Sequence, residues 1–476
     1  MQRLTKVGKI TPKTSNEVKH SRIGIGFEKL DRGVFDPEKA FDKVAAIGVK
    51  WVRIQSGWAR TEKEKGVYDF AWLDSIVDNL LARGLQPWMC LCYGNGLYDE
   101  NAAKIFGAVG VPPIFTDEQR AAWDAYVRAT VAHYKGRITH YEVWNEPDGK
   151  WCWKHGVNAF ELGAFTAATA KAVKAVDPTA EVIALAHCIP DLRYIHNALS
   201  VEGMAENIDA ISFHEYVTDE THIPERVDSM RAVADMFKKG IRLIQGESGS
   251  QSKSGGNGAL KKMLWSQKAQ MKQLARHTMM DLSTEVEFMS YFSCLDMVEA
   301  LKGAVGDTAT YKDYGYFGVL GADFDEEGRS VGTYSPKLSY YALQTIAAVF
   351  AEDYTVAEHM PVLSVPSYFE PYMQQDCTEH ELVRAFYRRE NGSECLVFWN
   401  PKNILTTDWV GTTSFQVITQ QKKVRLVDLC NGDVYTVPDT ILTDHGDGCL
   451  RFDHLPVTDC PMALLFGDFC DWSENV

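Results

Sequence analysis

The sequence has no run of about 18 apolar residues, the length that a membrane-spanning helix requires. Its first twenty residues contain no apolar core of the kind found in signal peptides. Basic residues are also few: 49 Lys and Arg stand against 64 Asp and Glu, for a net charge of −15. Nucleic-acid binding depends on basic patches. We therefore expect neither a membrane nor a nucleic acid as a partner.

Motifs for metals and cofactors are missing too. Eleven cysteines are scattered from Cys90 to Cys470, but Cys90 and Cys92 have no Cys or His partners at zinc-binding spacing, so we expect no metal site. No Gly-rich phosphate turn follows the first predicted strand, and we expect no cofactor. An odd number of cysteines, several within apolar runs, favours reduced, buried thiols and a cytoplasmic location.

Residues 21–350 alternate between short apolar runs and amphipathic stretches. The eight runs predicted as strands are 23–27, 51–55, 86–92, 140–146, 181–186, 208–214, 241–246 and 286–292. Asp36-Pro37 and the pair Thr116 and Gln119 carry helix-start signals, and the last two helices are predicted at 259–280 and from Ser335-Pro336 onward. Short apolar strands that alternate with helices predict parallel pairing. Eight such units favour an α/β fold, a closed (β/α)8 TIM barrel, over the alternative of an open doubly wound sheet.

The pattern changes after residue 350. Short apolar runs continue, but helical periodicity does not, and Asn391-Gly392 and Asn431-Gly432 separate pairs of runs as hairpin turns do. Residues 351–476 are therefore predicted to form a C-terminal antiparallel β-sandwich. Residues 1–20 form an N-terminal segment with one candidate strand, at 4–10, that could pair with this sandwich. The predicted catalytic barrel lies between them, at 21–350.

Two glutamates end predicted strands of the barrel. Pro147 cannot donate to a strand ladder, so the strand before it stops and leaves Asn145 and Glu146 at its carboxyl end. Glu247 follows Gly246 at the end of the seventh strand. In a closed barrel both ends face one pocket. Two carboxyl groups across a cleft suit glycoside hydrolysis, in which one donates a proton and the other attacks the sugar or activates water. Taken singly, either could be an ordinary surface carboxylate.

Other candidates for binding a substrate lie at or beside further strand ends. Arg53, inside an apolar strand, needs a carboxylate partner such as Glu247, although a structural salt bridge would explain it equally. His214 and Tyr216 end the sixth strand, where they could contact a sugar and orient Glu247, or belong to the core. The remaining candidates, each with a turn or core alternative, are Asn95, Trp151 and Tyr291.

These motifs resemble a known group of enzymes. Trp144-Asn145-Glu146-Pro147, Gly246-Glu247, Arg53 and Ser212-Phe213-His214-Glu215-Tyr216 look like the retaining glycoside hydrolases of clan A. The last of these motifs, the Asp36-to-Arg53 opening and the sandwich resemble family 39, which holds β-xylosidases, β-glucosidases and α-L-iduronidases. The resemblance implies that Glu146 is the acid/base, Glu247 the nucleophile and Asn145 the residue that holds the sugar 2-hydroxyl. Many clan members have Trp near the end of strand eight, where this chain has Tyr291-Phe292.

The resulting hypothesis is a retaining O-glycosyl hydrolase that needs no cofactor and acts on β-xylosides, β-glucosides or related small glycosides. We expect a raised pKa for Glu146 and a pKa of Glu247 lowered by Arg53. The long loops at 93–115 and 294–329 favour a closed pocket and exo action. Three alternatives remain: an endo-acting polysaccharide hydrolase, a transglycosylase, and a non-catalytic carbohydrate-binding protein. The sequence leaves open whether the chain forms homo-oligomers.

Overall fold

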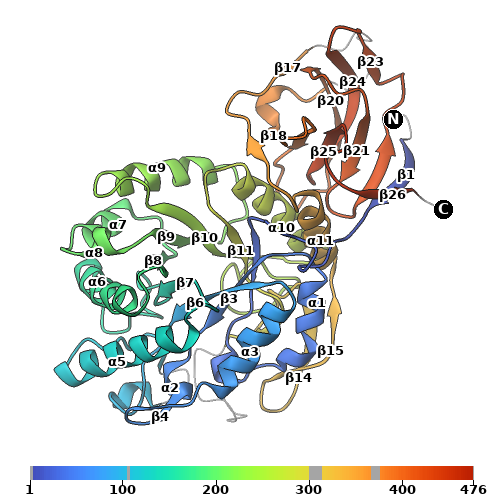
Figure 1. Ribbon diagram of the computed structural model, residues 1–476. Coiled ribbons are helices and arrows are strands. Elements are labelled where there is room, and N and C mark those ends of the chain that lie inside the picture. Colours follow the sequence, from blue (N-terminus) through green and yellow to red (C-terminus); the bar gives the residue numbers. More distant parts are fainter. Residues whose placement is uncertain (1–3, 104–107, 300–312, 366–375, 475–476) are drawn as a thin grey trace.

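The computed structural model describes residues 4–103, 108–299, 313–365 and 376–474, and it has two parts, a barrel and a strand-rich C-terminal part (Figure 1). The barrel is closed, with all neighbouring strands parallel, in the order β10-β11-β2-β3-β6-β7-β8-β9. Its strands are β2 (Ile23–Gly26), β3 (Trp51–Gln55), β6 (Gln86–Leu91), β7 (His140–Val143), β8 (Glu181–His187), β9 (Ala210–His214), β10 (Arg242–Ser248) and β11 (Met289–Tyr291). The predicted TIM barrel is confirmed.

Helices surround the barrel. They include α1 (Phe41–Ala45), α2 (Trp58–Thr61), α3 (Ala71–Ala82), α5 (Asp117–Tyr134), α6 (Ala159–Val176), α7 (Leu192–Leu199), α8 (Met204–Asn207), α9 (Ile223–Asp235), α10 (Gln267–Leu282) and α11 (Leu338–Val349). The predicted capping box opens α5, because the Thr116 side chain accepts from the Gln119 backbone and the Gln119 side chain accepts in return. Asp36 caps a short 3-10 turn, Pro37–Lys39, that precedes α1.

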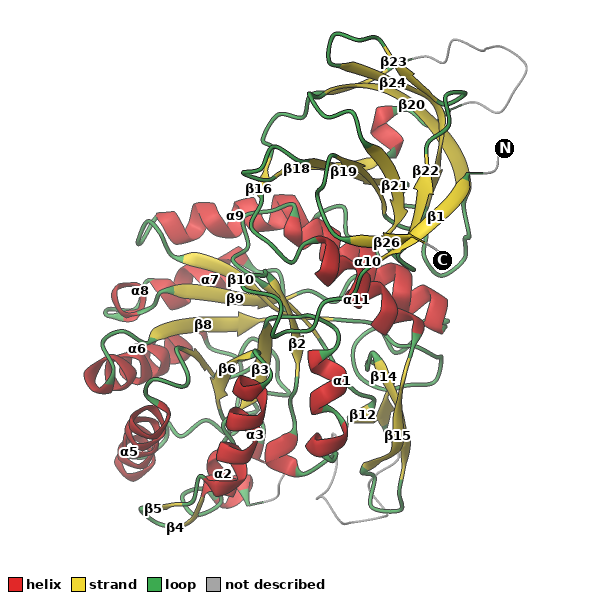
Figure 2. Cartoon of the chain, turned by 45° about the vertical axis from the view of Figure 1, so that its right-hand side comes forward, coloured by secondary structure: helices red, strands yellow, loops and turns green. Residues whose placement is uncertain are grey.

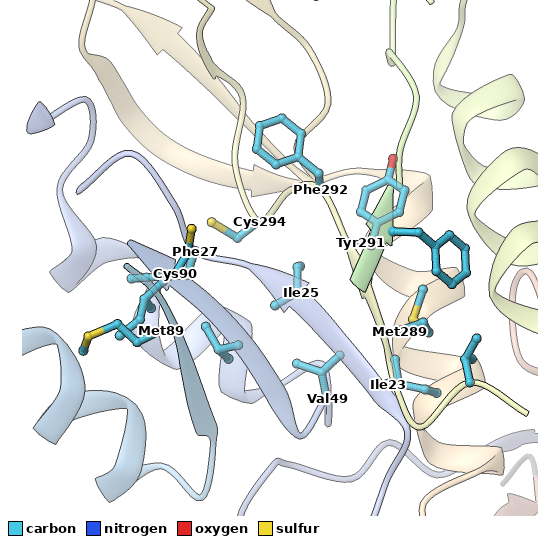
Figure 3. Close-up of a cluster of buried hydrophobic side chains, with 14 of the residues drawn as sticks. Ile23, Ile25, Phe27, Val49, Met89, Cys90, Met289, Tyr291, Phe292 and Cys294 are labelled. Carbon is cyan, nitrogen blue, oxygen red and sulfur yellow. The ribbon is translucent and has the colours of Figure 1, made fainter. Parts of the chain in front are cut away.

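Buried apolar side chains hold the barrel strands and their helices together. Figure 3 shows one cluster of them, in which Ile23 and Ile25 of β2 and Met289 of β11 come from the two strands that close the barrel. All three side chains are fully buried. Each apolar side chain of this size contributes roughly 1.5–3 kcal/mol when it leaves water. The apolar runs that predicted the strands therefore also supply the barrel's core.

Element boundaries differ from the prediction mainly around the last two barrel strands. β10 continues through Glu247 to Ser248, so this glutamate lies within the strand. The helix expected from residue 259 begins only at Gln267, where Ser266 caps it. Pro336, expected to open the last helix, instead ends β15 (Ser330–Pro336), which pairs with β14 (Leu320–Phe324). The region expected as one loop thus holds a hairpin, and also the short pair β12 (Met297–Val298) and β13 (Tyr314–Gly315).

The C-terminal part contains two antiparallel sheets, as predicted. The larger has the order β16-β18-β19-β25-β21-β22-β1-β26 and the smaller β17-β20-β24-β23. Their strands are β16 (Thr355–Val356), β17 (Val362–Ser364), β18 (Val383–Arg388), β19 (Glu394–Trp399), β20 (Val410–Ile418), β21 (Val424–Asp428), β22 (Asp433–Thr436), β23 (Leu442–Asp444), β24 (Cys449–Thr458), β25 (Met462–Phe466) and β26 (Trp472–Glu474). β1 (Thr5–Ile10) pairs with β22 and β26, so the first and the last described strands are neighbours in this sheet (Figure 1).

Hairpin turns occur where the Asn-Gly pairs predicted them. Gly392 connects β18 to β19 and Gly432 connects β21 to β22, with φ of 81° and 79°. A positive φ of this kind favours glycine. All eleven cysteines lie in the described part of the chain, and none of them forms a disulfide bond. Within that part, no helix combines the length and the apolar character needed to cross a membrane.

Helix α10 lies between the barrel strands and the C-terminal sheets (Figure 2). Its Lys272 and Arg276 side chains are buried and paired. Lys272 Nζ donates to Thr407 O at 2.8 Å, Asp408 Oδ1 at 2.5 Å and Asp459 Oδ2 at 2.6 Å. Arg276 donates to both carboxylate oxygens of Glu220 at 2.8 Å. The Lys272 contacts join the barrel to the sandwich, and so does Glu220 of the barrel, which also accepts from Trp399 Nε1 at 2.8 Å.

Candidate active site

The carboxyl end of β7 carries the first glutamate. The strand stops at Val143, and the next residues leave the extended conformation, with φ of 67° at Trp144 and 42° at Glu146. The strand predicted at 140–146 therefore ends at Val143. The Glu146 backbone N–H donates to Ala186 O at 3.0 Å, which fixes the turn against β8. As a result Asn145 and Glu146 line the same cavity.

A cavity of about 650 Å³ opens at this end of the barrel. Its volume lies within the range of small-molecule sites. Of the predicted site residues, it is lined by Asn145, Glu146, Trp151, Tyr216 and Glu247. Residues from both long loops, Val109 and Phe317, complete the wall. The cavity thus contains both glutamates that end predicted strands.

The two glutamates converge on His214. One carboxylate oxygen from each and a His214 ring nitrogen all lie within 4.8 Å of one another. His214 Nδ1 is 2.9 Å from Glu146 Oε1 and 3.8 Å from Glu247 Oε2. The Trp151 indole N–H donates to Glu146 Oε2, and the Tyr216 hydroxyl donates to Glu247 Oε1. Glu146 is therefore oriented by His214 and Trp151, and Glu247 by Tyr216.

Arg53 lies beneath this pair and is fully buried. Its Nη1 is 2.9 Å from Glu247 Oε2 and 3.1 Å from Glu28 Oε2, and its Nε is 2.8 Å from Glu142 Oε2. Its Nη2 donates to Asn145 Oδ1 at 2.8 Å. The expected pairing with Glu247 is present, but one guanidinium is shared among three carboxylates. It can therefore neutralise only part of their charge.

This charge balance reverses the expected order of the two pKa values. Burial raises the pKa of Glu247 to about 7, and the charges of Glu28 and Glu146 add to that effect against His214 and Arg53. Burial also acts on Glu146, but hydrogen bonds from His214 and Trp151 outweigh it and lower the pKa of that carboxyl. The expectation of a raised pKa for Glu146 and a lowered one for Glu247 is wrong for the free protein. A single proton shared by the pair resides mainly on Glu247.

The aromatic and imidazole groups around the pair are also shifted. Burial would lower the pKa of His214, but the adjacent Glu247 and Glu146 carboxylates raise it overall. Burial and the same two carboxylates raise the pKa of the Tyr216 hydroxyl well above its usual value. Tyr216 therefore stays a hydrogen-bond donor at any ordinary pH, and the two carboxylates favour the protonated form of His214.

Four predicted site residues do not line the cavity: Arg53 and His214 contact the glutamates from behind, whereas Asn95 and Tyr291 are turned elsewhere. Asn95 uses its side chain within a turn, where Nδ2 donates to Glu62 O at 2.9 Å and Oδ1 accepts from Leu97 N at 2.9 Å. Tyr291 is fully buried, and its hydroxyl faces Ser250 O at 3.4 Å. Its neighbour Phe292 lines the cavity instead. Figure 3 shows the two side chains leaving the end of β11 in different directions.

Several residues of the site were missed in the sequence. Glu28 and Gln55 line the cavity, and Glu142 pairs with Arg53 inside the barrel. A signal existed for each: Glu28 and Gln55 end predicted strands, and Glu142 is a charge within an apolar strand. Nothing in the sequence indicated that Glu28 and Glu142 pair with the same guanidinium, that of Arg53.

Two groups in the described part of the chain have metal-ligating atoms close together: Glu146, His214 and Glu247, and His140, Glu181 and Glu287. Both already contact a buried or partly buried guanidinium. Arg53 pairs with Glu247 at 2.9 Å, and Arg242 pairs with Glu287 at 2.9 Å and with Glu181. Since each set of carboxylates has a cationic partner, we assign a metal to neither.

Comparison with known proteins gives the same family as the motifs. Residues 32–244 match the family model of glycosyl hydrolases family 39. A β-xylosidase of Geobacillus stearothermophilus is 29% identical over 170 residues. That match covers 33% of this chain and 32% of the xylosidase, so the chain spans about a third of the curated relative's length in this alignment. The resemblance to family 39 is confirmed.

Solved structures show that the fold is shared over the whole chain. A family 39 glycoside hydrolase from Bacteroides cellulosilyticus WH2 superposes with a TM-score of 0.64 and 19% identity, covering 94% of this chain and 80% of the other. A monomeric β-xylosidase from Caulobacter crescentus CB15 gives a TM-score of 0.60 and 16% identity, covering 96% and 97%. At such identities the likeness is one of fold.

Proposed function

From this likeness to family 39, we propose that the protein is a retaining, exo-acting glycoside hydrolase with Glu247 as nucleophile and Glu146 as acid/base. One observation carries the proposal: carboxylate oxygens of these two residues lie within 4.8 Å of each other across a cavity at the carboxyl end of a closed barrel. Retaining enzymes hold their two carboxyl groups about 5–5.5 Å apart, whereas inverting enzymes need about 6.5–9.5 Å to admit water.

In the first step Glu247 attacks the anomeric carbon and Glu146 protonates the departing oxygen. The free protein holds the shared proton mainly on Glu247, so substrate binding has to be accompanied by its transfer to Glu146. His214 contacts both carboxylates and is suited to relay it. Arg53 and Tyr216 then stabilise the ionised nucleophile, through the contact at 2.9 Å and the hydroxyl hydrogen bond.

In the second step water attacks the anomeric carbon of the glycosyl-enzyme. Glu146, now ionised, removes a proton from that water, and the bond to Glu247 breaks with net retention of configuration. Trp151 donates to Glu146 from the exposed side of the cavity and orients it for both steps. Asn145, held by Arg53, lies beside Glu146 where it can bind the sugar 2-hydroxyl.

The shape of the cavity supports exo action. Lining residues from the loops after β6 and β11, with Asn257, Gly258 and Lys261 after β10, surround the glutamates on several sides. A walled cavity accepts the end of a chain more readily than its middle. β-Xylosides are the first substrates to examine because the curated relative is named a β-xylosidase; β-glucosides follow.

A panel of nitrophenyl glycosides tests this function. We expect release of nitrophenol from the β-xyloside or another β-glycoside, and proton NMR should detect the β-anomer of the sugar first. First appearance of the inverted anomer would contradict double displacement. Absence of release from every member of the panel would contradict the hydrolase assignment.

A further inference from the structure

One carboxylate in the cavity has no part in the double displacement. Glu28 follows β2, lines the cavity and is only 2% exposed. Its Oε2 accepts from Arg53 Nη1 at 3.1 Å and from Gln55 Nε2 at 3.4 Å. Its Oε1 is buried and has no hydrogen-bond partner among the described residues. A buried acceptor of this kind costs about 1–3 kcal/mol, and more for a charged group, until a donor reaches it.

The polar neighbours of Glu28 cannot supply that donor, since their own groups are engaged. Gln55 Oε1 accepts from Lys29 N and from Arg32 Nη2, and Gln55 Nε2 also donates to the Tyr93 hydroxyl at 3.1 Å. Lys29 Nζ donates to Glu299 Oε1 at 2.7 Å and to Val298 O at 3.2 Å. These contacts leave Glu28 Oε1 without a donor, which a hydroxyl of a molecule in the cavity can supply.

Glu28 also lies close to the reacting centre. Its Oε2 and Glu247 Oε2 contact the same nitrogen, Arg53 Nη1. A sugar whose anomeric carbon meets Glu247 thus reaches Glu28 with another part of the same ring. Sugar hydroxyls are donors, and a hydrogen bond from a hydroxyl to a carboxylate is among the stronger kinds. An acidic group at that position would be repelled.

We propose that Glu28 is a specificity-determining residue that accepts a hydrogen bond from one ring hydroxyl of the sugar in the cavity, and so selects a neutral sugar with a hydroxyl there. This assignment rests on the proposed function. It adds a recognition role to a residue that neither attacks nor transfers a proton. A site built to bond a hydroxyl discriminates strongly against an analogue that lacks it, because its buried acceptor is then left unpaired.

Binding measurements test the assignment without relying on turnover. Calorimetric titration of the full-length protein would compare D-xylose and D-glucose with their monodeoxy derivatives, each lacking one hydroxyl, for wild type, Glu28→Gln and Glu28→Ala. We expect wild type to lose about 10- to 100-fold in affinity for one derivative of the sugar it binds. Glu28→Ala should bind the parent sugar that much more weakly and be indifferent to removal of that hydroxyl. Glu28→Gln keeps an amide oxygen that accepts but carries no charge, so it should lose clearly less affinity for the deoxy sugar than wild type does.

The outcomes are distinct. If Glu28→Gln responds to every deoxy sugar as wild type does, the assignment to Glu28 is overturned. If wild type binds sugars with the expected pattern but releases no nitrophenol, the hydrolase proposal fails while the binding role of Glu28 stands. If wild type binds no sugar, both fail. Glu28→Gln keeps the side-chain shape beside Arg53, so it remains informative should Glu28→Ala not fold. Glu220→Gln, a buried carboxylate away from the cavity, serves as control.

Discussion

Buried charges occur in two regions of this protein, and the two are arranged differently. Between the barrel and the sandwich, Lys272 binds three oxygens and Arg276 forms a two-bond pair with Glu220. At the cavity, Arg53 is paired with three carboxylates, and a fourth carboxylate, that of Glu146, contacts His214. In the first region each of these two cations is matched by carboxylate partners. The second has more negative charge than its cations can neutralise.

The two arrangements of buried charge have different consequences, one for stability and the other for catalysis. A saturated buried pair contributes structure, and its loss leaves an uncompensated charge. An unbalanced cluster shifts pKa values and leaves acceptors free for a ligand, which is the pattern expected of a functional site. Substitutions in the cavity should therefore affect turnover, and substitutions at α10 should affect stability.

The largest effect should come from removal of the nucleophile. Glu247→Ala is expected to lower kcat for an aryl glycoside by about 10⁴-fold or more, because the covalent step has no other carboxylate in place. Steady-state kinetics measure it. The matched control is Glu220→Gln, which should keep kcat and lower the melting temperature. If kcat of Glu247→Ala falls by less than about tenfold, substitutions in the cavity do not differ from those at α10 in their effect on turnover.

Removal of the acid/base should depend on the leaving group. Glu146→Ala should slow a substrate with a poor leaving group by about 10²–10⁴-fold, and a dinitrophenyl glycoside far less, since that group departs without protonation. Azide needs no base, so it should restore turnover of the dinitrophenyl substrate and give a glycosyl azide of retained configuration. Product analysis by NMR checks this. Turnover that azide leaves unchanged would argue that Glu146 is not the base.

At the interface, Lys272→Met should cost about 3 kcal/mol of unfolding free energy, because Asp459 is left buried and unpaired. Denaturant unfolding measures the loss, and kcat of the folded fraction should stay at the wild-type value. The double variant Lys272→Met with Asp459→Leu should regain part of the stability, since no isolated charge remains. A fall in kcat at full folding would show that the interface also serves the site.

The pH dependence of kcat/KM should reflect the shared proton. Productive attack needs one proton on the glutamate pair. The pair loses that proton with a pKa of about 7 and takes up a second one below the usual carboxyl range. Activity should therefore fall as pH rises through about 7. Glu28→Gln removes a negative charge that faces Glu247, so it should move this limb to lower pH. If kcat/KM of Glu28→Gln falls at the same pH as that of wild type, the charge of Glu28 does not raise the pKa of the glutamate pair.

Much of the fold was predictable because its signals are local. Apolar strands alternating with capped helices indicated the barrel, and the Asn-Gly pairs indicated the hairpins at Gly392 and Gly432. The region after β10 was not predictable in the same way. Residues 259–266 resembled the start of a helix but pack as a loop, in which Leu260, Met263 and Trp265 contact Ile404 of the sandwich. That contact is long-range and leaves no local trace.

The site was predictable to the extent that strand ends define it. Glu146, Glu247 and Tyr216 line the cavity as their positions suggested, and Arg53 and His214 lie directly behind them. Asn95 and Tyr291 also end strands, but their side chains are turned into a local bend and the core. The order of the two pKa values depends on how many carboxylates share Arg53, a property of strand register that the sequence does not display.

The central claim is that Glu247 forms a covalent bond to the sugar. Incubation with a 2-deoxy-2-fluoro glycoside that has a good leaving group slows the second step and should let the intermediate accumulate. Mass spectrometry of the digested protein should then find one fluoro-sugar on the peptide that contains Glu247. A label on another residue, or continued turnover of that reagent without any label, would contradict the account.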